Sequence, residues 1–230
     1  MNSTATRVTE QTVRVEVPGL VLEGILAVPE DANGVVLFAH GSGSGRHNPR
    51  NLFVAEQLQS AGLATLLIDL LTADEERIDE RTRRIRFDID LLADRLCGAI
   101  EWLAAHPRTH GLRVGLFGAS TGGGAAAVAA AHEPGKVGAV VSRGGRPDLA
   151  GAALFAVLCP TLLIVGGDDE MIEELNRAAL AQIGAPVKEL IVVPGASHLF
   201  EEPGKLDEVA HLAAGWFVRH LGTGGGTYAG

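Results

Sequence analysis

The residue with the clearest chemical potential in this chain is Ser120, at the centre of a Gly-x-Ser-x-Gly motif formed with Gly118 and Gly122. The apolar run 112–117 precedes the motif, and the small-residue run 125–131 follows it. This order predicts a buried strand, a tight turn and a helix, with the serine hydroxyl at the apex of the turn. Glycines favour such a turn because larger side chains would crowd the neighbouring strand and helix. The motif therefore predicts a nucleophilic serine.

The same glycines allow a second interpretation, since Gly118, Gly122 and Gly124 also fit the dinucleotide-binding pattern Gly-x-x-x-Gly-x-Gly. That pattern normally joins the first strand and helix of a Rossmann domain, whereas this one lies halfway along the chain. The reductases that use it also need a Tyr-x-x-x-Lys pair, and the single tyrosine is Tyr228, near the C-terminus. The sequence favours the nucleophile over cofactor binding, with an ordinary glycine-serine turn as the remaining alternative.

A serine hydroxyl needs a general base to become nucleophilic, and the base needs a carboxylate to orient it. His198 follows the apolar run 190–193, and Asp169 follows the apolar run 161–165. Both runs read as buried strands, and open α/β sheets place their ligands just beyond the carboxyl ends of such strands. We therefore predict Ser120, Asp169 and His198 as a catalytic triad, in the order Ser, acid, His.

The choice of Asp169 as the acid rests on its spacing from its neighbours. In turns of this kind Gly166 is the first residue, Asp169 the fourth and Ile172 an apolar anchor. Asp168 is the alternative acid. Either carboxylate also suits the N-cap of the helix that follows, which leaves the other to orient His198.

Stabilising the oxyanion of an acyl-transfer reaction requires two backbone N–H donors. One is expected from Thr121, directly after the nucleophile. The other is expected from Ser42, in the glycine-rich segment 40–45 that follows an early apolar run. His40 opens this segment, and we expect it to brace the loop by hydrogen bonds instead of acting in catalysis.

The surrounding elements alternate between strands and helices. Residues 13–17 and 20–28 alternate apolar and polar side chains around Pro18-Gly19, which predicts an antiparallel hairpin at a sheet edge. Continuous apolar runs predict parallel strands that are buried on both faces. These runs are 35–39, 64–68, 137–141, 161–165 and 190–193.

Apolar residues at helical spacing predict helices over 89–103, 172–183 and 206–221, the second ending at Gly184 as a C-cap. The charged segment 71–87 reads either as a solvated, salt-bridged loop and helix start or as a rim of the site.

Strands alternating with helices predict an α/β class: a doubly wound, mostly parallel sheet with an N-terminal antiparallel hairpin and no cap domain. We expect one domain over residues 11–221, with residues 1–10 and 222–230 flexible.

Composition narrows the classes of function. A formal net charge of −9 supplies no broad basic face for a nucleic acid. No apolar run approaches the ~20 residues of a membrane helix, and residues 1–10 contain no apolar signal core, so we expect a cytoplasmic protein with a small-molecule partner. Cys97 and Cys159 lie in apolar elements and read as buried free thiols. The predicted chemistry needs no metal and no organic cofactor, and the oligomeric state stays open.

Four motifs together resemble the dienelactone hydrolase branch of the α/β-hydrolase superfamily. They are His40-Gly41-Ser42-Gly43-Ser44, Gly118-Ala119-Ser120-Thr121-Gly122, Gly166-Gly167-Asp168-Asp169 and Gly195-Ala196-Ser197-His198. The resemblance implies hydrolysis of small esters or lactones. Dienelactone hydrolases proper use a cysteine nucleophile, and Ser120 moves the expectation toward a serine esterase. Acyl transfer to another acceptor and a non-catalytic binding protein of the same fold are the alternatives.

The short connection 142–159 leaves little room for a lid, so we expect an open, shallow site that prefers small acyl groups. Several basic residues are expected on two loops that follow strand carboxyl ends, and they are candidates for binding a substrate anion. They are Arg46, His47, Arg50, Arg143 and Arg146. The alternative is that they are surface cations paired with local acids such as Asp148.

Overall fold

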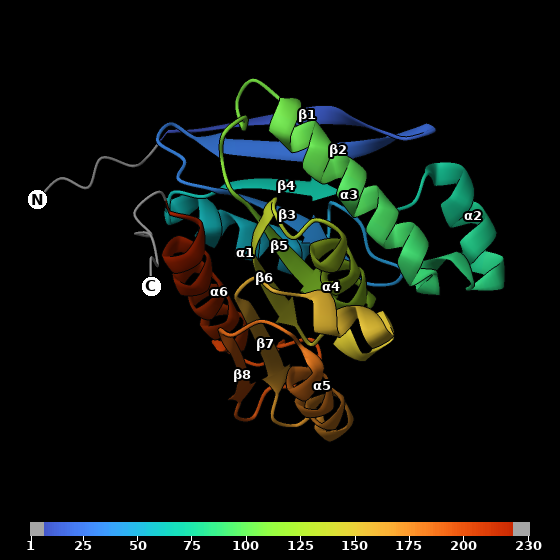
Figure 1. Cartoon of the computed structure of the whole chain (residues 1–230), viewed down its shortest axis with the longest axis vertical. Coiled ribbons are helices and arrows are strands. Elements are labelled where there is room, and N and C mark those ends of the chain that lie inside the picture. The colour runs from blue at the N-terminus through green and yellow to red at the C-terminus, as the bar shows by residue number, and fades with distance from the viewer. Residues whose placement is uncertain (1–6, 223–230) are drawn as a thin grey trace, which may run out of the picture.

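An eight-stranded sheet in the order β1-β2-β4-β3-β5-β6-β7-β8 forms the centre of the computed structural model, which describes residues 7–222 (Figure 1). β1 pairs antiparallel with β2, β2 pairs antiparallel with β4, and the remaining neighbours are parallel. The strands are β1 (Val8–Val17), β2 (Leu20–Pro29), β3 (Val35–Ala39), β4 (Ala64–Ile68), β5 (Val114–Ala119), β6 (Val137–Arg143), β7 (Thr161–Gly166) and β8 (Lys188–Val193).

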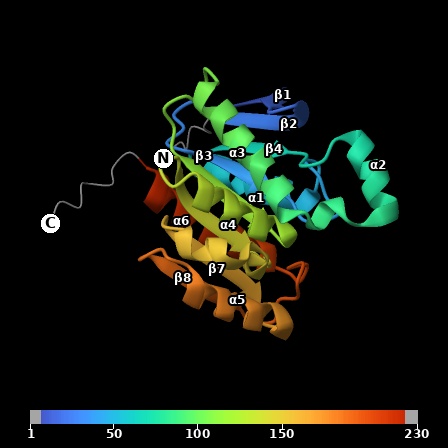
Figure 2. The same ribbon diagram turned by 45° about the vertical axis from the view of Figure 1, so that its right-hand side comes forward.

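Helices cover both faces of this sheet. They are α1 (Pro49–Ser60), α2 (Ala73–Thr82), η1 (Ile85–Phe87), α3 (Ile89–Ala105), α4 (Thr121–His132), η2 (Pro147–Ala156), α5 (Glu170–Gln182) and α6 (Lys205–Leu221). Figures 1 and 2 show α3, α4 and α5 on one face and α1 and α6 on the other. The predicted doubly wound sheet with its N-terminal hairpin is confirmed.

The sheet separates two apolar cores. The first core joins strand residues such as Leu37 and Leu116 to α3 and α4, and the second joins their chain neighbours Phe38 and Phe117 to α1 and α6. Successive side chains of a strand point to opposite faces, so one strand supplies both cores. Every residue of β3 to β7 is buried, which explains why these strands read as unbroken apolar runs.

The domain limits differ from the expectation at the N-terminus. β1 begins at Val8, because the antiparallel register with β2 continues as far as the pair Val8 and Pro29. Residues 8–10 therefore belong to a strand and not to a flexible arm. Residues 1–6 and most of the expected C-terminal tail, 223–230, lie outside the described part of the chain.

Gly184 does not serve as the left-handed C-cap that we expected. The C-cap of α5 is Ile183, in an extended conformation, and Gly184 is not among the glycines with positive φ. A Cβ atom at Gly184 would instead overlap the carbonyl oxygen of Phe155. The glycine is needed for the close approach of two backbones.

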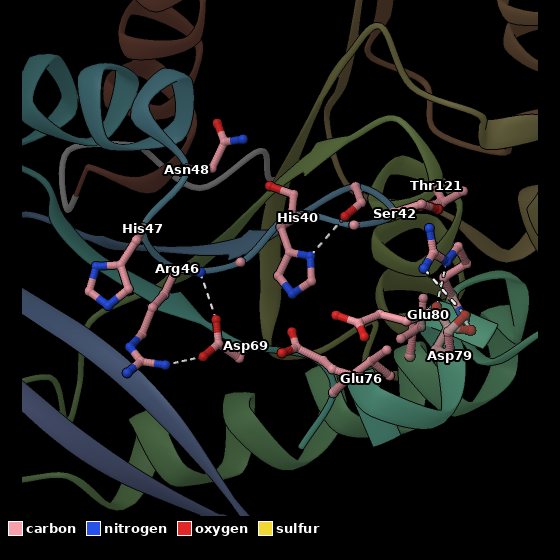
Figure 3. Close-up of a pocket in the computed structure, with 17 residues that line it drawn as sticks. His40, Ser42, Arg46, His47, Asn48, Asp69, Glu76, Asp79, Glu80 and Thr121 are labelled. Atoms are coloured by element: carbon pink, nitrogen blue, oxygen red, sulfur yellow. Dashed lines mark hydrogen bonds and ion pairs between the residues drawn. The ribbon is translucent and has the colours of Figure 1, made fainter. Parts of the chain in front are cut away.

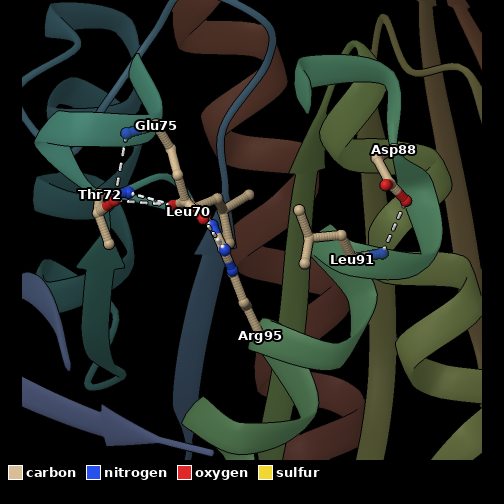
Figure 4. A network of polar contacts seen from close by, with 6 residues as sticks. All are labelled: Leu70, Thr72, Glu75, Asp88, Leu91 and Arg95. Atoms are coloured by element: carbon tan, nitrogen blue, oxygen red, sulfur yellow. Dashed lines mark hydrogen bonds and ion pairs between the residues drawn. The ribbon is translucent and has the colours of Figure 1, made fainter. Parts of the chain in front are cut away.

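The charged segment 71–87 folds as α2 and η1, and it is anchored more firmly than a solvated loop (Figure 4). Thr72 and Glu75 form a capping box at the start of α2. Arg95 of α3 donates to both Glu75 carboxylate oxygens, at 2.9 and 2.5 Å, and to the Leu70 carbonyl oxygen. These contacts fasten the segment to α3 just beyond the carboxyl end of β4.

α1 was not among the predicted helices, and its start is specified by Asn48 and Pro49. The Asn48 side chain accepts hydrogen bonds from the backbone N–H groups of Arg50 and Asn51, and Pro49 is the first helical residue. Arg50 therefore lies in the first turn of a helix and not on a loop as expected.

Between β6 and β7 the chain forms only the short helix η2. No cap domain is present within residues 7–222. In that same range no helix has both the length and the apolar character needed to cross a membrane.

Candidate active site

Ser120 stands at a strained turn between β5 and α4. Its backbone φ is 51° with ψ at −124°, a region that side chains other than glycine rarely adopt and that costs about 1–3 kcal/mol. A Cβ atom at Gly118 would lie 2.6 Å from the Gly122 carbonyl oxygen, and one at Gly122 would overlap the Ala39 carbonyl oxygen. The predicted strand–turn–helix is confirmed, and both glycines are required by close backbone contacts.

His198 lies on the loop after β8, and its Nδ1 is 2.7 Å from Oδ2 of Asp169 on the loop after β7. A carboxylate only accepts, so this contact places the proton on Nδ1 and leaves Nε2 of the neutral ring as an acceptor. The imidazole bonds to Asp169 and not to Asp168, whose backbone N–H donates to the Ala196 carbonyl oxygen at 3.0 Å. Asp169 makes no side-chain cap to α5, so its carboxylate is directed at the imidazole.

The loops that carry these two residues interlock. A Cβ atom at Gly166 would overlap the Ala196 carbonyl oxygen, which explains the glycine at the end of β7. The loop after β6 packs against the imidazole as well. Gly144 has a φ of 49°, and a Cβ atom there would lie 3.1 Å from the His198 carbonyl oxygen and 3.5 Å from its ring. The position of His198 thus depends on glycines in two neighbouring loops.

Ser120 and His198 line the same cavity, of about 260 Å³, together with Ser42, Arg50 and Arg143. Ser120 Oγ makes no hydrogen bond to another residue in the described part of the chain. Hydrogen bonds between a nucleophile and its base are often loose without substrate and tighten in the complex. The cavity therefore brings the serine and the imidazole together in one small space.

The two residues expected to supply oxyanion donors lie beside each other. Ser42 Oγ is 3.1 Å from Thr121 Oγ1, and a Cβ atom at Gly41 would come within 3.0 Å of the Ser120 Cβ. Within residues 7–222 neither the Ser42 nor the Thr121 backbone N–H donates to another group. Thr121 is also the first residue of α4, where backbone N–H groups have no partner within the helix.

His40 braces the loop, as expected. Its Nε2 accepts from the Leu70 backbone N–H at 2.9 Å, and its Nδ1 donates to the Gly41 carbonyl oxygen at 2.9 Å. Burial lowers the pKa of His40, which favours the neutral ring that this pattern needs. His40 holds the loop 40–45 against the end of β4.

The five basic residues predicted to bind an anion fall into two groups. Arg46 pairs with Asp69 and Glu23, and Arg146 pairs with Asp148 at 2.7 Å. Neither lines the cavity that contains Ser120, and nor does His47. Arg50 and Arg143 both line it.

Arg46 and His47 instead line a larger cavity, of about 540 Å³, on the other side of the loop 40–48 (Figure 3). Figure 3 shows Asp69, Glu76 and Glu80 grouped opposite His40. Burial, followed by the charges of Asp69 and Glu80, raises the pKa of Glu76. The larger cavity shares Gly41 and Ser42 with the smaller one, so it adjoins the site and has an acidic wall.

The sequence did not reveal that Asn48, Asn51 and Leu199 line the serine cavity. Asn48-Pro49 was the available signal for the first two, because it starts the helix that carries Asn51 to this edge of the sheet. Leu199 follows His198 directly and gave no signal of its own.

No group of three or more His, Cys, Asp or Glu side chains in residues 7–222 is arranged to hold a metal ion. Cys97 is a half-buried free thiol and Cys159 a buried one. Burial raises the pKa of each thiol to about 11, so neither is a ready nucleophile.

Comparison with known proteins identifies the family. The model of the dienelactone hydrolase family matches residues 22–217. The chain belongs to the dienelactone hydrolase family. Its fold agrees with a crystal structure of dienelactone hydrolase from Anabaena variabilis, which is 60% identical, with a TM-score of 0.91 over 93% of this chain and 99% of that one.

Two further relatives bear on different points. Est1E from Butyrivibrio proteoclasticus is 16% identical, with a TM-score of 0.75 over 91% of this chain and 98% of that chain, and it supports the fold alone. A Mycobacterium tuberculosis protein named "Putative phosphoribosyl transferase" is 57% identical over 212 residues. The match covers 92% of this chain but 47% of that protein, so this chain spans about half the length of its curated relative.

Proposed function

We propose that this dienelactone hydrolase family member hydrolyses small carboxylic esters or lactones through an acyl-enzyme on Ser120. The proposal depends on one arrangement above all: an imidazole held by Asp169 at 2.7 Å lines the same small cavity as a serine at a strained turn. The carboxylate, the imidazole and the serine are the three parts of a serine hydrolase triad.

In the proposed reaction, Ser120 Oγ attacks the carbonyl carbon while His198 Nε2 takes the hydroxyl proton. The negative oxygen of the tetrahedral intermediate accepts hydrogen bonds from the backbone N–H groups of Ser42 and Thr121. Collapse breaks the bond to the alcohol oxygen, which receives the proton from His198. Asp169 stabilises the imidazolium that forms between these steps.

Water completes the cycle. His198 takes a proton from a water molecule as the water oxygen attacks the acyl carbon. The bond to Ser120 Oγ then breaks, and Ser120 recovers its proton from His198. One ester and one water give one acid and one alcohol, or a single hydroxy acid when the substrate is a lactone.

Acyl transfer is the second candidate, because an acceptor alcohol or amine would replace water in the second half of the same cycle. The transferase name of the Mycobacterium tuberculosis relative directs attention to this possibility. That name belongs to a protein about twice as long, and this chain matches 47% of it. We therefore do not propose phosphoribosyl transfer for this chain.

Labelling with a fluorophosphonate probe, followed by a panel of short-chain and long-chain esters, tests the proposal. We expect one equivalent of covalent label on Ser120 and faster turnover of the short-chain esters. Ser120→Ala should abolish labelling and lower turnover roughly 10⁴-fold or more, with an unchanged circular dichroism spectrum.

Ser60→Ala is the matched control, since Ser60 is exposed at the end of α1 and bonds only to the Glu56 carbonyl oxygen. It should label and turn over like the wild type. Near-normal hydrolysis by a folded Ser120→Ala protein would refute the proposed mechanism. Product analysis with added alcohol separates the two candidates, because a transferase forms a new ester where a hydrolase releases only acid.

A further inference from the structure

Arg143 is held beside the nucleophile by the sheet itself. It is the last residue of β6, it pairs with Ala119 across the strands, and its carbonyl oxygen accepts from the Ser120 backbone N–H at 3.4 Å. Its side chain lines the same cavity as Ser120 and His198.

The Arg143 guanidinium is buried without a partner. The residue is 7% exposed, and its Nε and Nη1 are both buried with no hydrogen-bond acceptor. Burial, and then the nearby cation of Arg50, lowers the pKa of Arg143 to about 10. The group is still charged at neutral pH, and a buried charge without a partner is costly.

The other strongly buried arginine in the described part of the chain, Arg95, has an acidic partner. Arg95 is 4% exposed, and its guanidinium donates to both carboxylate oxygens of Glu75. Arg86, which is less buried, pairs with Asp79. No acidic side chain of residues 7–222 forms an ion pair with Arg143, so the acceptor that this fold supplies elsewhere is missing beside Ser120.

Arg50 adds a second cation to the same cavity. Its Nη1 donates to Glu201 at 2.9 Å, but the Glu201 side chain is 61% exposed and the Arg50 Nε is buried without a partner. Two like charges facing one small cavity repel each other unless an anion lies between them. A planar guanidinium donates two parallel hydrogen bonds to a carboxylate or a phosphate.

We propose that Arg143, assisted by Arg50, binds a compact oxyanion on the ester that Ser120 cleaves, so that the substrate class is an ester bearing a carboxylate or a phosphate. This inference rests on the proposed function, because it assigns the substrate of that same site. The 260 Å³ cavity limits the anion to a position close to the scissile bond.

Matched substrates test the inference in catalysis. One pair carries the charge on the acyl side: mono-4-nitrophenyl glutarate against 4-nitrophenyl pentanoate. The other carries it on the alcohol side: 2-acetoxyethyl phosphate against 2-methoxyethyl acetate. Arg143→Met should lower kcat/KM for the anionic member of at least one pair about 10- to 150-fold, while the neutral members change less than about threefold. The pair that responds identifies the anion.

Arg177→Met is the control, because Arg177 pairs with Glu173 on α5 and lies outside this cavity. It should leave both pairs unchanged. Equal losses on anionic and neutral esters in Arg143→Met, or no loss on either, would overturn the inference.

A binding measurement separates this inference from the proposed mechanism. Titration of glutarate and of inorganic phosphate into Ser120→Ala, followed by calorimetry, needs no turnover. We expect one of the two anions to bind Ser120→Ala and not the double variant with Arg143→Met. That result supports the subsite even if Ser120 proved not to be the nucleophile. Failure of both anions to bind Ser120→Ala would overturn the subsite while leaving the mechanism intact.

Discussion

Ser120 keeps an unfavourable backbone conformation because its surroundings leave it no other. Gly118 and Gly122 allow the β5–α4 turn to close, and the Ser120 carbonyl oxygen accepts from the backbone N–H groups of Gly123 and Arg146, both at 2.9 Å. These contacts fix the serine relative to the loop after β6. Pre-organisation of this kind means that little rearrangement is needed when a substrate binds.

The neighbouring acids Asp168 and Asp169 should differ sharply in their importance for turnover. Asp169→Asn is expected to lower kcat roughly 10³- to 10⁴-fold, because an amide no longer enforces the proton on Nδ1 of His198. Asp168→Asn removes a carboxylate that does not contact the imidazole, and it should retain most of the activity. The comparison requires kcat for both variants on one short-chain ester. Comparable losses would leave the orienting acid unassigned, and the reverse order would transfer the role to Asp168.

The turn between α2 and η1 is held by the side chain of Asp79. Asp79 is 2% exposed and accepts from the backbone N–H groups of Ile85 and Arg86, at 2.7 and 3.1 Å, and from the Arg86 guanidinium. Asp79 thereby closes the turn that follows α2. This turn borders the larger cavity beside the loop 40–48.

Asp79→Asn should reduce the free energy of unfolding by about 1–3 kcal/mol at pH 7, since a buried acceptor of charge-assisted hydrogen bonds is lost. Burial alone would raise the pKa of Asp79, but the hydrogen bonds from Arg86 and Ile85 lower it below its ordinary value of 3.8. A lowered pKa stabilises the fold above the unfolded value and is lost as the pH falls through the folded one. In urea unfolding, the difference between wild type and variant should therefore be full at pH 7 and shrink below about pH 3.8.

Asp74→Asn provides the control for this measurement. Asp74 lies on the same helix and pairs with Arg77, but both side chains are mostly exposed. Its free energy of unfolding should match the wild type within about 0.5 kcal/mol at each pH. An Asp79→Asn difference that did not depend on pH would show that the carboxylate charge is not what stabilises the turn.

The elements also show what the sequence can predict. The strands β3 to β7 were predictable because a strand covered on both faces is apolar throughout, and the turn at Ser120 was predictable because it follows β5 directly. His198 lies on the loop after β8, an edge strand that is only partly buried although its apolar run 190–193 predicted burial on both faces. Arg50 was misplaced because the helix start at Asn48-Pro49 was not recognised. The sequence around Arg143 did not indicate that its guanidinium would lack an acidic partner. That lack results from how β6, α1 and the loop after β8 pack together.

At the scale of the whole molecule, the candidate site belongs to the sheet and not to any one segment. Ser120, Asp169 and His198 follow β5, β7 and β8, and the loop carrying Ser42 follows β3. Parallel strands end at the same edge, so residues far apart in the chain meet there. Because both cores are built on the same strands, the geometry of the site should be lost with the whole domain in one step.

The two tryptophans allow this coupling to be measured. Trp102 on α3 packs against the first core, and Trp216 on α6 lies in the second. Trp102→Phe and Trp216→Phe each leave one fluorophore, which reports on one face of the sheet. Within each variant, urea unfolding followed by fluorescence and by far-ultraviolet circular dichroism should give coincident transitions, as expected for a single cooperative unit. If fluorescence in one variant changed before the circular dichroism signal, that face would open independently, and the site at the shared edge would have to tolerate partial unfolding.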